Sequence, residues 1–123
     1  MHIDHINIAA PADLLETVRA FYCEVLGLKD GFRPRFGQNG YWLYAGDKAI
    51  VHLSESERHR RKESPGYLDH VAFQTSGLKS MIARLDANRI EYRSNHIPEF
   101  NMTQLFFTDP AGTGLEVNFP DET

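Results

Sequence analysis

Hydrophobic residues cluster in short runs along this chain, and four of the runs are each interrupted by one histidine or glutamate. The interrupting residues and their runs are His5 (Ile3 to Ala9), His52 (Ala49 to Leu53), His70 (Leu68 to Phe73) and Glu116 (Leu115 to Phe119). Apolar runs of this length, bounded by turn residues and rich in β-branched and aromatic side chains, predict strands. Each of the four residues therefore marks a polar position in an otherwise apolar strand.

Two amphipathic helices are predicted where apolar residues recur at helical period. The first has Asp13 as its predicted N-cap, Glu16 at capping-box spacing, and an end at Gly27. The second ends near Asn88, a residue tolerated in a left-handed C-cap. The apolar positions that define the helices are Leu14, Val18, Phe21 and Val25 in the first, and Leu78, Met81, Ile82 and Leu85 in the second.

The same order of elements then occurs twice. In the first half, a loop at 30–40 is followed by a hairpin that joins residues 41–44 to the strand of His52. In the second half, a strand at 90–93 and a loop at 94–101 are followed by a hairpin of residues 104–107 and 114–119. His5 and His70 are 65 residues apart, and His52 and Glu116 are 64 apart. We therefore predict an α+β fold made of two βαβββ modules, at 1–53 and 67–119, joined by a charged linker at 54–66.

Strand parity places the four interrupting residues on polar faces, because side chains of a strand alternate between its two sides. Asn7 shares a face with His5, Gln74 with His70, and Asn118 with Glu116. His52 shares its face with Ile50, opposite Val51 and Leu53. Three of the four strands thus have an apolar side and a polar side, and the polar side predicts a surface for a ligand.

Composition and charge exclude some classes of function. The 123 residues are 41% hydrophobic and carry a formal charge of −4, which argues against non-specific nucleic-acid binding. Cys23 is the only cysteine, so an intrachain disulfide is impossible and a reducing cytoplasm is expected. No apolar run reaches the roughly 18 residues of a membrane span. We therefore expect a cytoplasmic protein without a nucleic-acid or membrane partner.

Imidazole and carboxylate groups that converge from different strands suit a divalent ion: Zn, Ni, Co, Mn or Fe. The metal ligands expected on this basis are His5, His52, His70 and Glu116. The amides of Asn7, Gln74 and Asn118 can orient them. A single histidine in a half-buried strand is more often a structural residue, but a carboxylate such as Glu116 in an apolar strand is costly unless paired or metal-bound.

The sequence resembles the vicinal oxygen chelate superfamily, which includes glyoxalase I, bleomycin and fosfomycin resistance proteins, epimerases and extradiol dioxygenases. The resemblance lies in the repeated Asp-His openings at 4–5 and 69–70, the helical segment 21–28 and the ending 107–116. It implies a U-shaped mixed sheet around a central cleft, a homodimer, and metal ligands at the four positions already named. It also implies that the metal chelates two neighbouring substrate oxygens and stabilises an enolate or alkoxide.

Departures from individual members leave the reaction open. Glyoxalase I has a glutamate where His52 stands, which leaves Glu116 as the candidate base of that reaction. Fosfomycin-type thiol transferases have a threonine at Asn7 and a tyrosine at Phe106. Extradiol dioxygenases use a facial triad that His5, His70 and Glu116 match, with His52 then a pocket acid or base, but they are about twice as long.

The expected function is that of a metal-dependent, glyoxalase-like lyase or isomerase acting on a small metabolite, with glutathione or another thiol as a candidate co-substrate. The alternatives are a bleomycin-resistance-type binding protein without metal, a thiol transferase and an extradiol-type dioxygenase. Candidate catalytic residues are Glu116 and His52, and candidate substrate-binding residues are Asn7, Arg33, Arg35, Trp42 and Phe106. The basic run at 58–62 is balanced by glutamates and is interpreted as a solvated linker.

Overall fold

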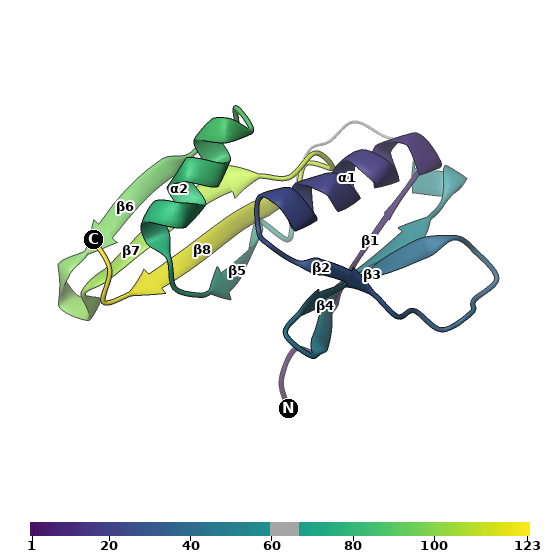
Figure 1. The fold of residues 1–123 in the computed structure, drawn as a ribbon, viewed down its shortest axis with the longest axis horizontal. Helices are drawn as coiled ribbons and strands as arrows, with labels where there is room; N and C mark the ends of the chain where they lie inside the picture. Colours follow the sequence, from purple (N-terminus) through teal and green to yellow (C-terminus); the bar gives the residue numbers. More distant parts are fainter. Residues whose placement is uncertain (60–66) are drawn as a thin grey trace. The chain divides into compact units, whose positions relative to one another are not determined.

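The chain folds as two compact units, Met1–Lys62 and Glu63–Thr123 (Figure 1). The structure is a computed structural model that describes residues 1–59 and 67–123. The part of the predicted linker at 60–66 lies outside these described residues. Within 54–59, the last strand of the first unit extends to Glu55, and a 3₁₀-helix, η1 (Glu57–His59), follows it.

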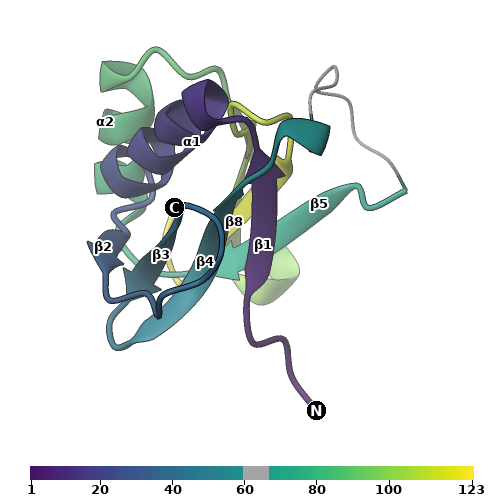
Figure 2. The same ribbon diagram turned by 90° about the vertical axis from the view of Figure 1, so that its right-hand side faces the viewer.

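The first unit is a βαβββ module. Its elements are β1 (Ile6–Ala10), α1 (Ala12–Glu24), β2 (Lys29–Gly31), β3 (Gly40–Ala45) and β4 (Lys48–Glu55). The strand order in the sheet is β1-β4-β3-β2, with β1 parallel to β4 and the other pairs antiparallel. Figure 2 shows β1 and β4 side by side.

The second unit repeats this topology. Its elements are β5 (His70–Gln74), α2 (Leu78–Ala87), β6 (Arg93–Ile97), η2 (Pro98–Phe100), β7 (Met102–Thr108) and β8 (Gly114–Pro120). The sheet order is β5-β8-β7-β6, and β5 is again parallel to β8. The predicted α+β fold of two βαβββ modules is therefore confirmed, and each module has its own four-stranded mixed sheet.

In each unit the apolar side of the sheet packs beneath the helix. Val51 and Leu53 of β4 are fully buried, as are Val117 and Phe119 of β8, while the residues between them are partly exposed. The helices contribute Leu15, Val18, Phe21 and Tyr22 from α1, and Leu78, Met81 and Leu85 from α2. The predicted strand parity is confirmed, so His52 and Glu116 lie on the sheet faces opposite the cores.

The ends of the helices differ from the sequence prediction. Helix α1 begins at Ala12 with Pro11 as N-cap and no side-chain cap, so Asp13 lies inside the first turn, and the carboxylate of Glu16 accepts a hydrogen bond from the Tyr41 hydroxyl. Gly27 has φ of +75°, as expected of the residue after this helix. Asn88, which caps α2, has φ of −95°, and the left-handed conformation falls on Arg89.

Three strands also differ in extent. β1 begins at Ile6, so His5 directly precedes the strand instead of lying in it. β6 spans Arg93–Ile97 rather than 90–93, because the amide of Ile90 donates to the carbonyl of Leu85 and closes the end of α2. A short strand, β2, lies in the segment predicted as a loop, where it pairs with β3. Among the described residues, no helix is long and apolar enough to cross a membrane.

Candidate functional site

The second unit brings together two of the predicted ligands, His70 and Glu116. His70 is the first residue of β5 and pairs with Gly114, and Ala72 pairs with Glu116, so both side chains lie on the face opposite α2. The Nε2 atom of His70 is 3.2 Å from Oε2 of Glu116. The His70 side chain is 42% exposed and that of Glu116 only 12%. The pair therefore faces solvent through the imidazole.

Neighbouring side chains bind the atoms of His70 and Glu116 that do not contact the other member of the pair. Nδ1 of His70 lies 2.8 Å from Oδ2 of Asp69. Gln104 on β7 donates from Nε2 to Oε1 of Glu116 at 2.7 Å and to Oδ1 of Asn118 at 3.1 Å. The sequence interpretation missed Gln104, although its position on the polar face of the neighbouring strand marks it. These contacts engage the other polar atoms of the two side chains and leave Nε2 of His70 and Oε2 of Glu116 next to each other.

The charge around His70 favours its protonated form. The hydrogen bond that the imidazole donates to Asp69 raises the pKa of His70 above its usual value, desolvation opposes the rise, and the Glu116 carboxylate adds to it. The imidazole can bind a metal only after losing its Nε2 proton. A metal at this pair must therefore compete with that proton.

The separation of the two donor atoms fits a shared metal ion. Ligand bonds of 2.0–2.2 Å at tetrahedral or octahedral angles separate adjacent nitrogen and oxygen donors by about 2.9–3.5 Å. The 3.2 Å between His70 and Glu116 falls within this range. Two donors do not complete a site, and within residues 1–59 and 67–123 no group of three or more histidine, cysteine, aspartate or glutamate residues is placed to hold an ion.

The equivalent residues of the first unit form a ring stack. The rings of His5 and His52 have centroids 3.7 Å apart and planes inclined by 12°. The opposite face of His52 stacks on Trp42 at 4.1 Å and 13°. Trp42 and His52 are direct partners across the antiparallel pair of β3 and β4, which holds the stack in register.

Stacking prevents His5 and His52 from binding one ion together. An imidazole lone pair lies in the plane of its ring, and a single ion cannot lie in two nearly parallel planes 3.7 Å apart. Nδ1 of His5 is 2.7 Å from Oδ2 of Asp4, the same support that Asp69 gives His70. Burial, and then the neighbouring His5, lower the pKa of His52. His5 therefore has the oriented nitrogen, and His52 is kept neutral.

The remaining predicted residues have varied surroundings. Asn7 accepts a hydrogen bond from the Ser54 hydroxyl at 2.9 Å. Arg33 donates to the carbonyl of Gln38 at 3.2 Å and lies over the ring of Phe36, so it holds its own loop together. Arg35 is exposed. Trp42 lines a pocket of about 430 Å³ in the first unit, and Phe106 one of about 640 Å³ in the second.

Residues 2–117 match the family model of the Glyoxalase/Bleomycin resistance protein/Dioxygenase superfamily. The chain belongs to this superfamily. Members of the superfamily commonly bind small-molecule substrates and form dimers. The vicinal oxygen chelate resemblance is thereby confirmed over nearly the whole chain. A search of curated proteins finds no match.

Solved structures share the glyoxalase fold with this chain. A glyoxalase family protein from Bacillus anthracis is 24% identical, with a TM-score of 0.76 and coverage of 98% of this chain and 95% of the other. A glyoxylase/bleomycin resistance protein/dioxygenase domain from Frankia sp. is 19% identical, with a TM-score of 0.74 and 98% coverage of both chains. Lactoylglutathione lyase from Agrobacterium tumefaciens is 20% identical, with a TM-score of 0.68 and coverage of 96% and 92%. These likenesses establish the fold.

Proposed function

We propose that this protein is a metal-dependent enzyme of the glyoxalase type, acting on a small metabolite that presents two neighbouring oxygen atoms. The observation that carries the proposal is the 3.2 Å approach of His70 Nε2 to Glu116 Oε2, with Asp69 and Gln104 holding the far ends of the pair. Carboxylates supported in this way are typical of metal centres, where second partners fix the orientation of each ligand. Superfamily membership supports the same function.

In this proposal His70 and Glu116 hold the ion, and His5 is a further candidate ligand, as the superfamily resemblance implies. His5 is chosen over His52 because Asp4 orients it as Asp69 orients His70. A divalent ion bound there supplies a Lewis acid that polarises a carbonyl group of the substrate. Asp69 and Gln104 keep the two side chains in place while substrate and product exchange.

We propose His52 as the residue that takes up a proton. Its pKa is lowered by burial and by His5, so the imidazole is neutral near pH 7 and can accept a proton. Glu116 is less suited to this role, because one oxygen accepts a hydrogen bond from Gln104 and the other faces His70. The Trp42 ring limits movement of His52 from its opposite face.

The metal site is tested by titrating the metal-free protein with Co²⁺ and following the visible absorption of the bound ion. We expect one ion per chain for the wild type and a loss of binding in His70→Ala and Glu116→Gln. His96→Ala is the matched control, since His96 lies in the same unit and contacts Thr103 instead of the pair. A wild-type protein that binds no Co²⁺, Zn²⁺, Ni²⁺, Mn²⁺ or Fe²⁺ excludes the proposal.

The reaction is tested separately with the metal-loaded protein. Methylglyoxal with glutathione, fosfomycin with a thiol, and catechols represent the lyase, transferase and dioxygenase reactions. Turnover of one of them that is lost in Glu116→Gln identifies the reaction. If the loaded protein turns over none of the three, these specific reactions are excluded.

A metal-free binding function is the second candidate, favoured by the ring stack in the first unit. Trp42 lies beside a pocket of about 430 Å³ and is the only tryptophan of the chain, so its fluorescence reports directly on a ligand there. Under this candidate, bleomycin, whose bithiazole tail is planar, quenches Trp42 equally with and without EDTA. Quenching that requires the metal favours the enzyme instead.

We propose that the protein acts as a homodimer, in keeping with its superfamily. β1 and β5 are edge strands of their sheets, and exposed edges are commonly covered by a partner. Ile3 and Leu68, which precede these two strands, are strongly exposed apolar residues. Sedimentation equilibrium at micromolar concentration is expected to give twice the mass of the chain, and a monomer excludes the dimer.

A further inference from the structure

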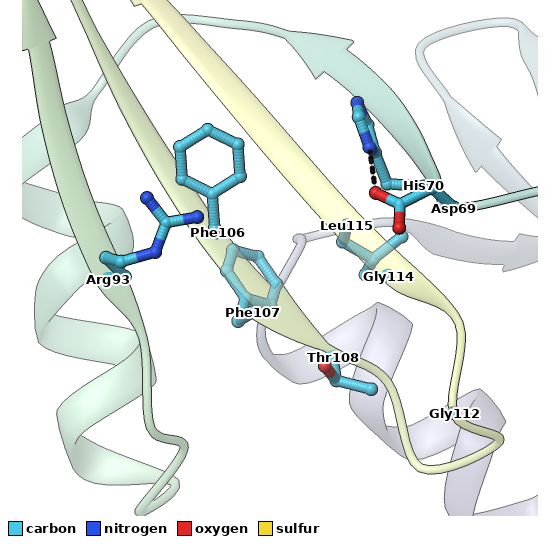
Figure 3. Close-up of a pocket in the computed structure, with 9 residues that line it drawn as sticks. All are labelled: Asp69, His70, Arg93, Phe106, Phe107, Thr108, Gly112, Gly114 and Leu115. Carbon is cyan, nitrogen blue, oxygen red and sulfur yellow. Dashed lines mark hydrogen bonds and ion pairs between the residues drawn. The ribbon is translucent and has the colours of Figure 1, made fainter. Parts of the chain in front are cut away.

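The open face of the second sheet extends beyond the His70–Glu116 pair to an arginine at the opposite edge. In one row across the strands, Phe106 on β7 is the direct partner of both Arg93 on β6 and Glu116 on β8. A pocket of about 640 Å³ is lined by Asp69, His70, Arg93, Phe106 and Thr108, together with Phe107, Leu115 and the turn glycines Gly112 and Gly114, and it does not reach Glu116. Figure 3 shows Phe106 between the guanidinium of Arg93 and the side chain of His70.

Arg93 is held flat by the aromatic ring beside it. Its guanidinium carbon lies 4.3 Å from the centroid of the Phe106 ring. Stacking of this kind fixes the plane of the guanidinium while its N–H groups, which lie in that plane, remain available. Among the described residues, the guanidinium of Arg93 has no hydrogen bond or ion pair, and its one stacking contact is with the Phe106 ring. The group is therefore oriented but not neutralised.

The net negative charge of the chain means that an anion needs a specific cationic side chain in order to bind. The protein carries a formal charge of −4, so an anion gains nothing from its overall field. Across the same pocket, Asp69 is already engaged by His70. An oriented guanidinium is the side chain best suited to a carboxylate or phosphate, since it can donate two parallel hydrogen bonds. Among the described residues that line the pocket, Arg93 is thus the side chain best suited to an anion.

We propose that Arg93 binds a carboxylate or phosphate group of the substrate, whose apolar part lies over Phe106 and whose neighbouring oxygens reach the His70–Glu116 end of the face. The second half of this statement rests on the proposed function. Two steps between paired strands put the Cα atoms of Arg93 and Glu116 about 10 Å apart. The substrate is accordingly a small organic anion with its charge several bonds away from the chelating oxygens.

Ordinary surface packing is the competing explanation for the Arg93–Phe106 contact, because exposed arginines often cover aromatic rings. Packing alone predicts a loss of stability when Arg93 is replaced, and no selectivity between an anion and a neutral molecule of the same shape. Anion recognition predicts selectivity without dependence on a metal. The two explanations are therefore separated by binding measurements on the metal-free protein.

The experiment titrates ¹⁵N-labelled, metal-free protein with benzoate, phenyl phosphate and the neutral benzamide. We expect shifts of the amide signals of Arg93, Phe106 and Thr108 with one or both anions and none with benzamide. The anion that binds more tightly shows whether the site prefers a carboxylate or a phosphate. Arg93→Gln should weaken that binding about tenfold. The matched control Arg84→Gln, on α2, should not, because Arg84 bonds to Ser80 of its own helix.

Two results overturn the inference: benzamide binding as tightly as the anions, or unchanged anion binding in Arg93→Gln. Arg93→Lys serves as a second variant, which keeps the charge but not the fork of donors and should restore only part of the affinity. Co²⁺ titration of Arg93→Gln should give the wild-type affinity. If the wild type binds benzoate through Arg93 but binds no metal, the proposed function fails and the anion site stands. If it binds the metal but neither anion, the anion site alone is overturned.

Discussion

His70 and Glu116 meet through Nε2 and Oε2 at 3.2 Å across the parallel strands β5 and β8. The register that produces this meeting occurs in both modules: the residue two after His70 pairs with Glu116, and the residue two after His5 pairs with His52. The same backbone position thus holds a carboxylate in one module and an imidazole in the other. The carboxylate faces the neighbouring nitrogen, whereas the imidazole stacks on the neighbouring ring.

Gln104 is expected to strengthen metal binding through Glu116. Gln104→Ala removes the hydrogen bond to Oε1 and lets the carboxylate turn, so the Co²⁺ affinity should fall about tenfold. Gln74→Ala is the control, because the described structure gives the exposed Gln74 side chain no hydrogen bond to His70 or Glu116, although the sequence suggested it as an orienting amide. A Co²⁺ titration in which both variants match the wild type would show that Glu116 needs no support.

His5 and His52 are expected to respond differently to replacement by phenylalanine, which keeps a ring in the stack and removes the nitrogens. His5→Phe should weaken Co²⁺ binding by more than the roughly tenfold cost of losing a supporting residue. His52→Phe should leave the affinity close to that of the wild type, since its ring is enclosed between His5 and Trp42. The opposite order of affinities would assign the ligand role to His52.

Glu122 is expected to stabilise the second unit by capping α2. Its carboxylate accepts hydrogen bonds from the amides of Gly77, at 2.8 and 3.2 Å, and Leu78, at 3.0 Å, and Gly77 has no side chain to do so. Glu122→Ala should lower the free energy of unfolding by about 1 kcal/mol in urea denaturation followed by circular dichroism. The control Glu99→Ala should leave the transition unchanged, and an equal loss in both variants would contradict the capping role.

Tyr41 is expected to contribute to the free energy of unfolding at neutral pH and to lose this contribution at alkaline pH. Its hydrogen bond to Glu16, followed by burial, raises the pKa of the hydroxyl above its ordinary value of 10.0. A group whose pKa is raised by folding contributes stability that is complete below the unfolded pKa and is lost as pH rises through the folded one. Tyr41→Phe should therefore cost at most about 1 kcal/mol at pH 8.

Urea denaturation at pH 8 and at pH 11 checks this expectation. The difference between Tyr41→Phe and the wild type should shrink at the higher pH, whereas Tyr92→Phe in the second unit should show no such change. A difference that grows with pH would mean that the hydroxyl does not need its proton for the contact with Glu16.

The sequence alone determined the repeated βαβββ order and the face on which Glu116, His52 and His70 lie, because both depend on local periodicity. It failed at the ends of elements, where individual backbone hydrogen bonds decide the first and last residue. Asp13 is no cap for α1, because the helix already begins at Ala12, directly after Pro11. Likewise, the amide of Ile90 donates to the carbonyl of Leu85 at the end of α2, so β6 begins only at Arg93.

What only the tertiary structure decided is how the four interrupting residues meet. From sequence spacing, His5 and His52 were predicted as metal ligands just as His70 and Glu116 were, because repeat-related positions are equivalent along the chain. The fold brings Gln104 to Glu116 and Trp42 to His52 from neighbouring strands, and these contacts set the orientation of each side chain. Metal coordination depends on the direction of lone pairs, which is a property of packed side chains and not of residue type.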